Sequence, residues 1–162
     1  MYISVNPVSG SYFNFSIPES VGVVAVFAPQ KSGLLGLVTQ VATIIAGGNT
    51  CVVLASEQLA LCAVTFAEVL ATSDVSGGVV NILTGNQEEL LFQFASHKDV
   101  NTILYCGDDS EKIKSIQELS IENMKRVVIR EDSNYFEDKH ESPYLIFDFQ
   151  ETKTTWHPIE VI

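Results

Sequence analysis

The residues best suited to covalent chemistry are the three cysteines, Cys51, Cys62 and Cys106. Each lies inside an apolar segment and none belongs to a Cys-x-x-Cys pair, so reduced and buried thiols are the default expectation. Cys106 could act as a nucleophile, because it ends an apolar run just ahead of a helical segment whose N-terminus would lower the pKa of a nearby thiol. Asp108 and Asp109 follow directly, and two carboxylates oppose a thiolate. We therefore expect Cys106 to be an ordinary core thiol.

Metal-binding residue types are present but poorly arranged. The three histidines, His97, His140 and His157, are far apart in sequence and have no ligand spacing. Four carboxylates form an acidic patch in which the regular alternation of a calcium loop is missing: Asp132, Glu137, Asp138 and Glu141. We interpret this patch as a solvated loop and expect no metal site.

Composition limits the kind of protein this can be. The chain has 162 residues, of which 46% are hydrophobic, and its mean hydropathy is +0.22, so it can form one domain with a real core. A formal net charge of −11 excludes nucleic acid as the expected partner, because polyanions are bound through Lys and Arg. No apolar run reaches membrane-spanning length, and the N-terminus lacks the basic start of a secretory signal. We expect a cytoplasmic protein that does not contact a membrane.

Along the chain, β-prone apolar runs alternate with stretches whose apolar residues have helical spacing. The region from Val21 to Gln58 contains a strand, a helix closed by Gly47-Gly48-Asn49, and a second strand. The predicted strands are Val21–Ala28, Cys51–Leu54, Val79–Leu83, Asn101–Cys106 and Lys125–Arg130. The predicted helices are Leu34–Ala46, Leu61–Leu70, Gln87–Ala95 and Asp109–Leu119. This rhythm predicts an α/β fold, a parallel sheet of about five strands with helices on both faces.

The two ends of the chain differ from this middle region. Tyr2–Ile17 predicts a short extended arm with a turn. Asn134–Ser142 is charged and turn-like, Tyr144–Phe149 alternates as a strand would, and Thr152–Ile162 is β-prone. These segments predict extended structure outside the central sheet.

A set of motifs carries a family resemblance. In order and spacing they are Val21-Gly22-Val23-Val24, Pro29, Ala46–Thr50 (AGGNT), Ser56-Glu57-Gln58, Gly78–Gly85 (GVVNILTG), Ala95–Val100 (ASHKDV), Gly107 and Lys125-Arg126-Val127. Over about residues 18–130 the chain resembles the cofactor-binding domain of the aldehyde dehydrogenase superfamily, and motifs in register are far more specific than any one alone.

The resemblance implies a Rossmann-like domain and a projecting antiparallel β-ribbon built from the N-terminal arm and the C-terminal tail. On this basis we assign residues 1–20 and 142–162 to the ribbon, an oligomerisation element, residues 21–133 to the cofactor domain, and residues 134–141 to a linker. A whole aldehyde dehydrogenase is several times longer, so the catalytic domain is absent between these parts.

The family's catalytic positions are altered. Its chemistry uses a cysteine nucleophile, amide donors for an oxyanion, a glutamate base and NAD as hydride acceptor. The resemblance places Lys31 where the family has the oxyanion asparagine, and Arg130 where it has the glutamate base. Arg130 is a cation that cannot accept a proton. The nucleophilic cysteine belongs to the absent domain.

The family's cofactor positions are altered as well. The ribose-binding lysine is replaced by Leu54 and the following proline by Ala55, although Glu57 is kept. Gly107 matches the glycine beside the pyrophosphate, and Asp108 replaces the serine after it. A carboxylate at Asp108 would cap the helix itself and repel a diphosphate. We regard Glu57, Gly107 and Asp108 as a vestigial cofactor site and expect no cofactor, with NAD or NADP as the ligand if the ancestral site survives.

Three functions follow from this reading. The first is a non-catalytic aldehyde dehydrogenase-like domain that acts in folding and oligomeric association, pairing its strand edges with a second copy or with a dehydrogenase-type partner chain. The second is a nucleotide-binding module for NAD, NADP or a related adenylate. The third is the cofactor half of a split NAD-dependent aldehyde dehydrogenase, an oxidoreductase, against which Arg130 and Lys31 both count.

Overall fold

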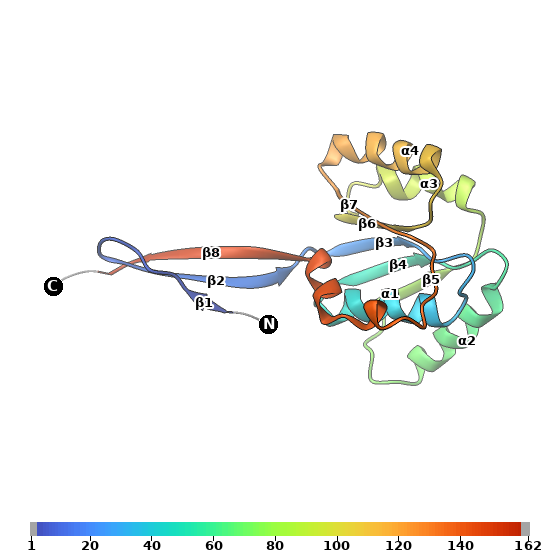
Figure 1. Ribbon diagram of the computed structural model, residues 1–162, viewed down its shortest axis with the longest axis horizontal. Coiled ribbons are helices and arrows are strands. Elements are labelled where there is room, and N and C mark those ends of the chain that lie inside the picture. Colours follow the sequence, from blue (N-terminus) through green and yellow to red (C-terminus); the bar gives the residue numbers. More distant parts are fainter. Residues whose placement is uncertain (1–2, 160–162) are drawn as a thin grey trace.

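Five short strands form a parallel sheet in the order β5-β4-β3-β6-β7 (Figure 1). The computed structural model describes residues 3–159. The strands are β3 (Val23–Phe27), β4 (Thr50–Leu54), β5 (Val80–Leu83), β6 (Thr102–Cys106) and β7 (Arg126–Arg130). The central strand β3 and its neighbour β6 are almost wholly apolar, as strands covered on both faces must be. All five predicted strands are present.

Four helices cover the sheet, two on each face (Figure 1). They are α1 (Leu35–Ala46) and α2 (Ala60–Ala71) on one face, and α3 (Gln87–Ser96) and α4 (Ser110–Ser120) on the other. A short 3₁₀ turn, η1 (Ile121–Asn123), follows α4. Leu37, Val41 and Ile44 of α1 pack in one core cluster, whereas Phe94 of α3 and Ile116 of α4 pack in the other. The α/β prediction with helices on both faces is therefore confirmed.

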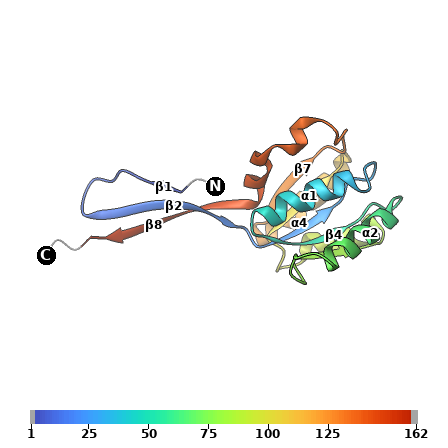
Figure 2. The ribbon, with the colours of Figure 1, turned by 90° about the horizontal axis from the view of Figure 1, so that it is seen from below.

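A three-stranded antiparallel ribbon projects from this body (Figures 1 and 2). It consists of β1 (Ser4–Val5), β2 (Tyr12–Ser20) and β8 (Gln150–Pro158), in the order β1-β2-β8. β2 and β8 pair over nine residues, from Tyr12 opposite Pro158 to Ser20 opposite Gln150. The predicted ribbon of N-terminal arm and C-terminal tail is confirmed.

The stretch between β7 and β8, residues 131–149, is here named the return segment. It contains two 3₁₀ helices, η2 (Asp138–Glu141) and η3 (Pro143–Phe149), and η3 lies against α1 (Figure 2). The prediction of strand-like structure for Tyr144–Phe149 is wrong. Pro143 favours the first turn of a helix, and Phe149 is fully buried in the core cluster of α1. Burial of one large aromatic side chain outweighs the local preference for an extended chain.

No helix within residues 3–159 has the length and apolar character needed to cross a membrane.

Candidate functional site

The turn after β3 lies at the carboxyl ends of the strands, where parallel sheets bind their ligands. The backbone N–H groups of Gln30 and Lys31 both donate to Oδ2 of Asp132, each at 2.9 Å. Asp132 belongs to the return segment, about one hundred residues further along the chain. The turn in which the family places its oxyanion donor is thus occupied by a carboxylate of the chain itself.

Glu57 is a second carboxylate that is hydrogen-bonded within the chain at this edge. Its Oε1 accepts a hydrogen bond of 2.7 Å from the backbone N–H of Gln87, the first residue of α3. A carboxylate at this position also interacts favourably with the helix dipole. The backbone N–H of Glu57 in turn donates to Oε1 of Gln30 at 3.0 Å. The carboxylate that the resemblance assigns to a ribose therefore closes the N-terminus of α3.

The N-terminus of α4 is capped by Asp109, not by Asp108 as the sequence predicts. Oδ1 of Asp109 accepts from the backbone N–H groups of Glu111 at 3.0 Å and Lys112 at 3.2 Å. Asp109 has the extended backbone of an N-cap residue, from which its carboxylate reaches the second and third helical amides. Asp108 is exposed beside it. The anion-binding end of α4 is satisfied internally, one residue later than predicted.

The same edge of the sheet contains Lys112, Leu54 and Gly107. Nζ of Lys112 on α4 donates to Oε1 of Gln87 on α3 at 3.4 Å, which joins the two helix N-termini. Leu54 is fully buried in the core under these helices and does not extend toward a ligand. Gly107 packs closely, because a Cβ at this position would lie 2.9 Å from the hydroxyl of Tyr105. Glu57, Gly107 and the start of α4 are therefore brought to one edge, as expected for residues after parallel strands.

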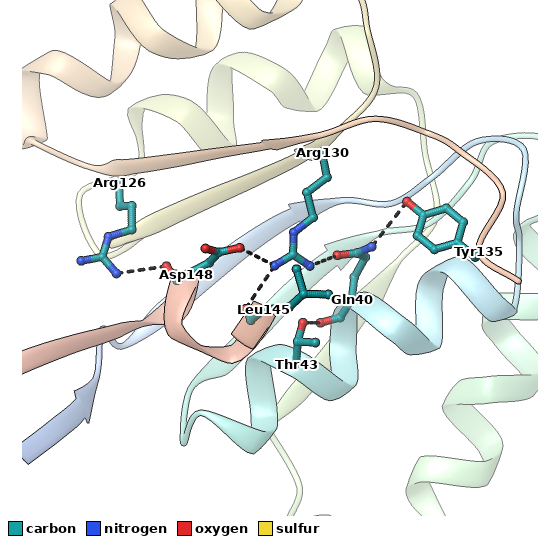
Figure 3. Close-up of polar contacts among 7 residues, drawn as sticks. All are labelled: Gln40, Thr43, Arg126, Arg130, Tyr135, Leu145 and Asp148. Carbon is teal, nitrogen blue, oxygen red and sulfur yellow. Dashed lines mark hydrogen bonds and ion pairs between the residues drawn. The ribbon is translucent and has the colours of Figure 1, made fainter. Parts of the chain in front are cut away.

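Arg130, which the resemblance aligns with the family's base, is a structural anchor (Figure 3). Its Nη1 donates to Oε1 of Gln40 on α1 at 2.5 Å, and its Nη2 donates to the carbonyl of Leu145 at 3.2 Å. Nη2 also forms an ion pair of 2.7 Å with Oδ2 of Asp148. The guanidinium carbon lies 5.2 Å from the centre of the Phe149 ring, within the range of a cation–π contact. Arg130 thus joins β7, α1 and η3.

The side chains of Arg126 and Asn49 also donate hydrogen bonds to the end of the return segment. Nη1 of Arg126 donates to the carbonyls of Asp148 at 3.0 Å and Gln150 at 2.8 Å. Nδ2 of the buried Asn49 donates to the carbonyl of Phe149 at 2.9 Å. The return segment is therefore fastened to the body at both ends of the sheet.

Cys106 lacks the environment of a nucleophile. Its side chain is 2% exposed, and burial raises the pKa of the thiol from 9.0 to about 12. A neutral thiol without access to solvent is a packing residue. Among residues 3–159, no three histidine, cysteine or carboxylate side chains gather closely enough to hold a metal ion.

Sequence reasoning missed the roles of Asp132, Gln30 and Gln40. The sequence predicts that Asp132 belongs to a solvated acidic loop, whereas in the structure its carboxylate organises the turn after β3. Gln40 is buried on the apolar face of α1, where its side-chain amide contacts Arg130 and Tyr135. A glutamine in the middle of an apolar helical stripe is the one signal that could have indicated a buried polar contact.

Comparison with known proteins extends these observations. A profile of the aldehyde dehydrogenase family matches residues 2–134. Aldehyde dehydrogenase family 2 member C4 of Arabidopsis thaliana is 31% identical over 138 residues, which are 85% of this chain and 26% of that protein. Hydroxyisobutyraldehyde dehydrogenase of Mycolicibacterium austroafricanum is 36% identical over 100 residues, which are 62% of this chain and 20% of that protein.

Solved structures give the same result. PnpE from Pseudomonas sp. WBC-3 superposes with a TM-score of 0.74 at 29% identity, over 78% of this chain and 26% of its own. The NAD+ complex of an aldehyde dehydrogenase from Bacillus cereus superposes with a TM-score of 0.76 at 26% identity, over 81% of this chain and 26% of its own. The present chain spans about a quarter of the length of most of these relatives. With most of the chain matched in both sequence and fold, it belongs to the aldehyde dehydrogenase family.

Proposed function

We propose that this chain is a non-catalytic domain of the aldehyde dehydrogenase family, and that its function is oligomeric association through the ribbon. The observation that carries the proposal concerns the carboxyl edge of the sheet, where the family's chemistry is expected and where internal carboxylates already occupy the backbone N–H groups. There, three sets of backbone N–H groups donate hydrogen bonds to carboxylates of the chain itself, those of Asp132, Glu57 and Asp109. A site already satisfied by fixed internal anions must lose those contacts before it can bind a diphosphate or an oxyanion.

The residues available for chemistry support the same proposal. Arg130 is held by Gln40, Leu145 and Asp148, and its charge cannot serve as a general base. A partner chain could supply a nucleophile, but it could not restore a base at this position. The alternative of a split enzyme therefore requires that the partner carry both groups.

The ribbon supports association. β8 is an edge strand of nine residues that pairs only with β2 within the described sheet. β8 carries the exposed aromatic side chain of Trp156, and its partner β2 carries those of Tyr12 and Phe13. An edge strand with exposed aromatic side chains is a template for another strand, and the partner we propose is a second copy or a dehydrogenase-type chain.

The test is the mass of the protein in solution, measured by multi-angle light scattering across a dilution series. We expect an oligomer that Trp156→Glu shifts toward the monomer. The matched control is Phe92→Glu on α3, because Phe92 is 56% exposed and Trp156 is 58% exposed. A monomer at every concentration, or an equal effect of both variants, would contradict association through the ribbon.

A second candidate is residual binding of NAD or NADP. It is favoured by one observation, the close turn at Gly107, where the tight packing against Tyr105 leaves the backbone near the start of α4. Glu57 would contact the ribose and the α4 N-terminus the phosphates, after Asp109 releases its cap.

A further inference from the structure

A polar hollow lies at the amino ends of the strands, at the opposite edge of the sheet from the site described above. Its volume is about 490 Å³, within the range of small-molecule sites. The polar residues that line it come from the α3–β6 loop, β6, the turn after α4, β7 and the base of β8: Lys98, Asn101, Thr102, Asn123, Arg126 and Glu151. Neither the family's chemistry nor the proposed association uses this hollow.

Hydrogen-bond donors outnumber acceptors among these side chains. Oδ1 of Asn101 already accepts from the backbone N–H of Val23 at 2.9 Å, so its Nδ2 is the group left for a ligand. Arg126 uses Nη1 for two carbonyls, while its Nη2 has only a 3.5 Å contact with Oε1 of Glu151. Lys98 is exposed at the rim. Asn123 donates its Nδ2 to the carbonyl of Lys98 and contributes an acceptor, Oδ1.

Thr102 gives an independent indication of a missing partner. It is fully buried, and its Oγ1 has no hydrogen-bond partner among the residues that the structure describes. Thr102 and Arg126 are register partners on β6 and β7, so their side chains leave the same face of the sheet. An unpaired buried hydroxyl is costly, and Thr102 lines the hollow beside Arg126, where a ligand would supply the missing partner.

The charge of the lining selects the ligand. The chain carries a net charge of −11 and only nine Lys and Arg residues, yet Lys98 and Arg126 both line this hollow, opposed within it by Glu151 alone. Two cations, an amide and a hydroxyl favour phosphate or carboxylate oxygens, which accept charge-assisted hydrogen bonds. We propose that the hollow binds a small anion through a phosphate or carboxylate group, with Lys98, Arg126 and Thr102 as its donors.

The test is titration of the ¹⁵N-labelled full chain with inorganic phosphate and, separately, with succinate, against sodium chloride at equal ionic strength. We expect saturable shifts of the Asn101, Thr102 and Arg126 amide resonances with at least one of the two probes and none with chloride. The two probes distinguish a phosphate ligand from a carboxylate ligand.

Two variants and one control make the assignment specific. Lys98→Gln is a surface change that should leave the fold intact and weaken binding about fivefold or more, because it removes a charged donor. Thr102→Val keeps the shape and should weaken binding about tenfold. The control is Lys114→Gln on α4, an exposed lysine paired with Glu118 at 3.8 Å, which should have no effect. Shifts that do not saturate, or an equal loss in Lys98→Gln and Lys114→Gln, would overturn the proposal in favour of ordered water or diffuse ion binding.

Discussion

Arg130 and Asp148 form an ion pair of 2.7 Å that connects the last strand of the sheet to the 3₁₀ helix before the ribbon. The Arg130 side chain is 12% exposed and that of Asp148 is 42% exposed, so the arginine end is shielded from solvent. Arg130 therefore contributes to the fold, because it fastens the return segment to the sheet.

Removing this anchor should destabilise the protein. We expect Arg130→Gln to lower the free energy of unfolding by about 2–3 kcal/mol, because Gln40 and Asp148 lose a charged donor in a largely buried position. The measurement is urea unfolding followed by circular dichroism. The matched control is Lys153→Gln, since Lys153 pairs with Glu19 at the same 2.7 Å but on the exposed ribbon. That variant should cost much less, because an exposed ion pair contributes little to stability, and an equal cost in both would contradict the role assigned to burial.

A glutamate at position 130 should not produce aldehyde dehydrogenase activity. Arg130→Glu would place a carboxylate against Asp148 and the amide oxygen of Gln40, at a cost of about 3–5 kcal/mol. We expect the variant to unfold at a lower temperature and to reduce no NAD in the presence of an aldehyde. NADH absorbance above the wild-type baseline would show that the remaining machinery is competent and would count against the non-catalytic proposal.

Asn49 of the AGGNT motif should be as important as the arginine. Its Nδ2 donates to the carbonyls of Ile44 and Phe149, and its Oδ1 accepts from the backbone N–H of Gly22. Asn49→Asp keeps the shape but turns both donors into acceptors that face carbonyls, so we expect a loss of about 2–4 kcal/mol. The chemical denaturation midpoint gives the answer, with Asn86→Asp as the control, since Asn86 caps α3 through its oxygen alone. A shift no larger than that of Asn86→Asp would refute the role of Asn49.

Alkaline pH should destabilise the fold through its buried thiols. Burial raises the pKa of Cys51 and of Cys106 from 9.0 to about 12, so between these values the native state binds more protons than the unfolded chain. The free energy of unfolding is then unaffected below about pH 9 and falls as the pH rises toward 12, by about 1.4 kcal/mol per unit for each thiol. Tyr105, whose pKa burial raises to about 12, adds to the slope above pH 10.

Urea unfolding at several alkaline pH values measures this slope. Cys106→Ala should reduce it, and Cys62→Ala on α2 is the control for removing a cysteine that is only partly buried. A slope that Cys106→Ala leaves unchanged would contradict the assignment to the buried thiols.

Nicotinamide cofactors should not stabilise the chain. A ligand at one hundred times its dissociation constant raises the free energy of unfolding by about 2.7 kcal/mol. We expect no change in melting temperature with NAD or NADP at millimolar concentration, because the α3 and α4 N-termini are closed by Glu57 and Asp109. The Bacillus cereus aldehyde dehydrogenase, whose structure contains NAD+, is the positive control. A saturable rise that is lost in Glu57→Gln would favour the second candidate function.

The sequence by itself determined the alternation of strands and helices and the ribbon. These features depend on local patterns: β-branched runs, helical apolar stripes, the Gly-Gly-Asn stop, and residue types that can be compared position by position. The two faces of the sheet follow from the same patterns, because each strand and helix must bury its own apolar side.

Only the tertiary structure decided what the altered residues do. Asp132 contacts the turn at Gln30, and Arg130 contacts Gln40 across ninety positions of the chain, separations at which local patterns carry no information. The sequence predicts Asp108 as the N-cap of α4, whereas the structure has Asp109 there. The geometry of a cap depends on backbone angles that the residue type does not specify. Tyr144–Phe149 forms a 3₁₀ helix and not the predicted strand. Burying the Phe149 side chain in the core beside α1 stabilises the fold more than an extended chain would.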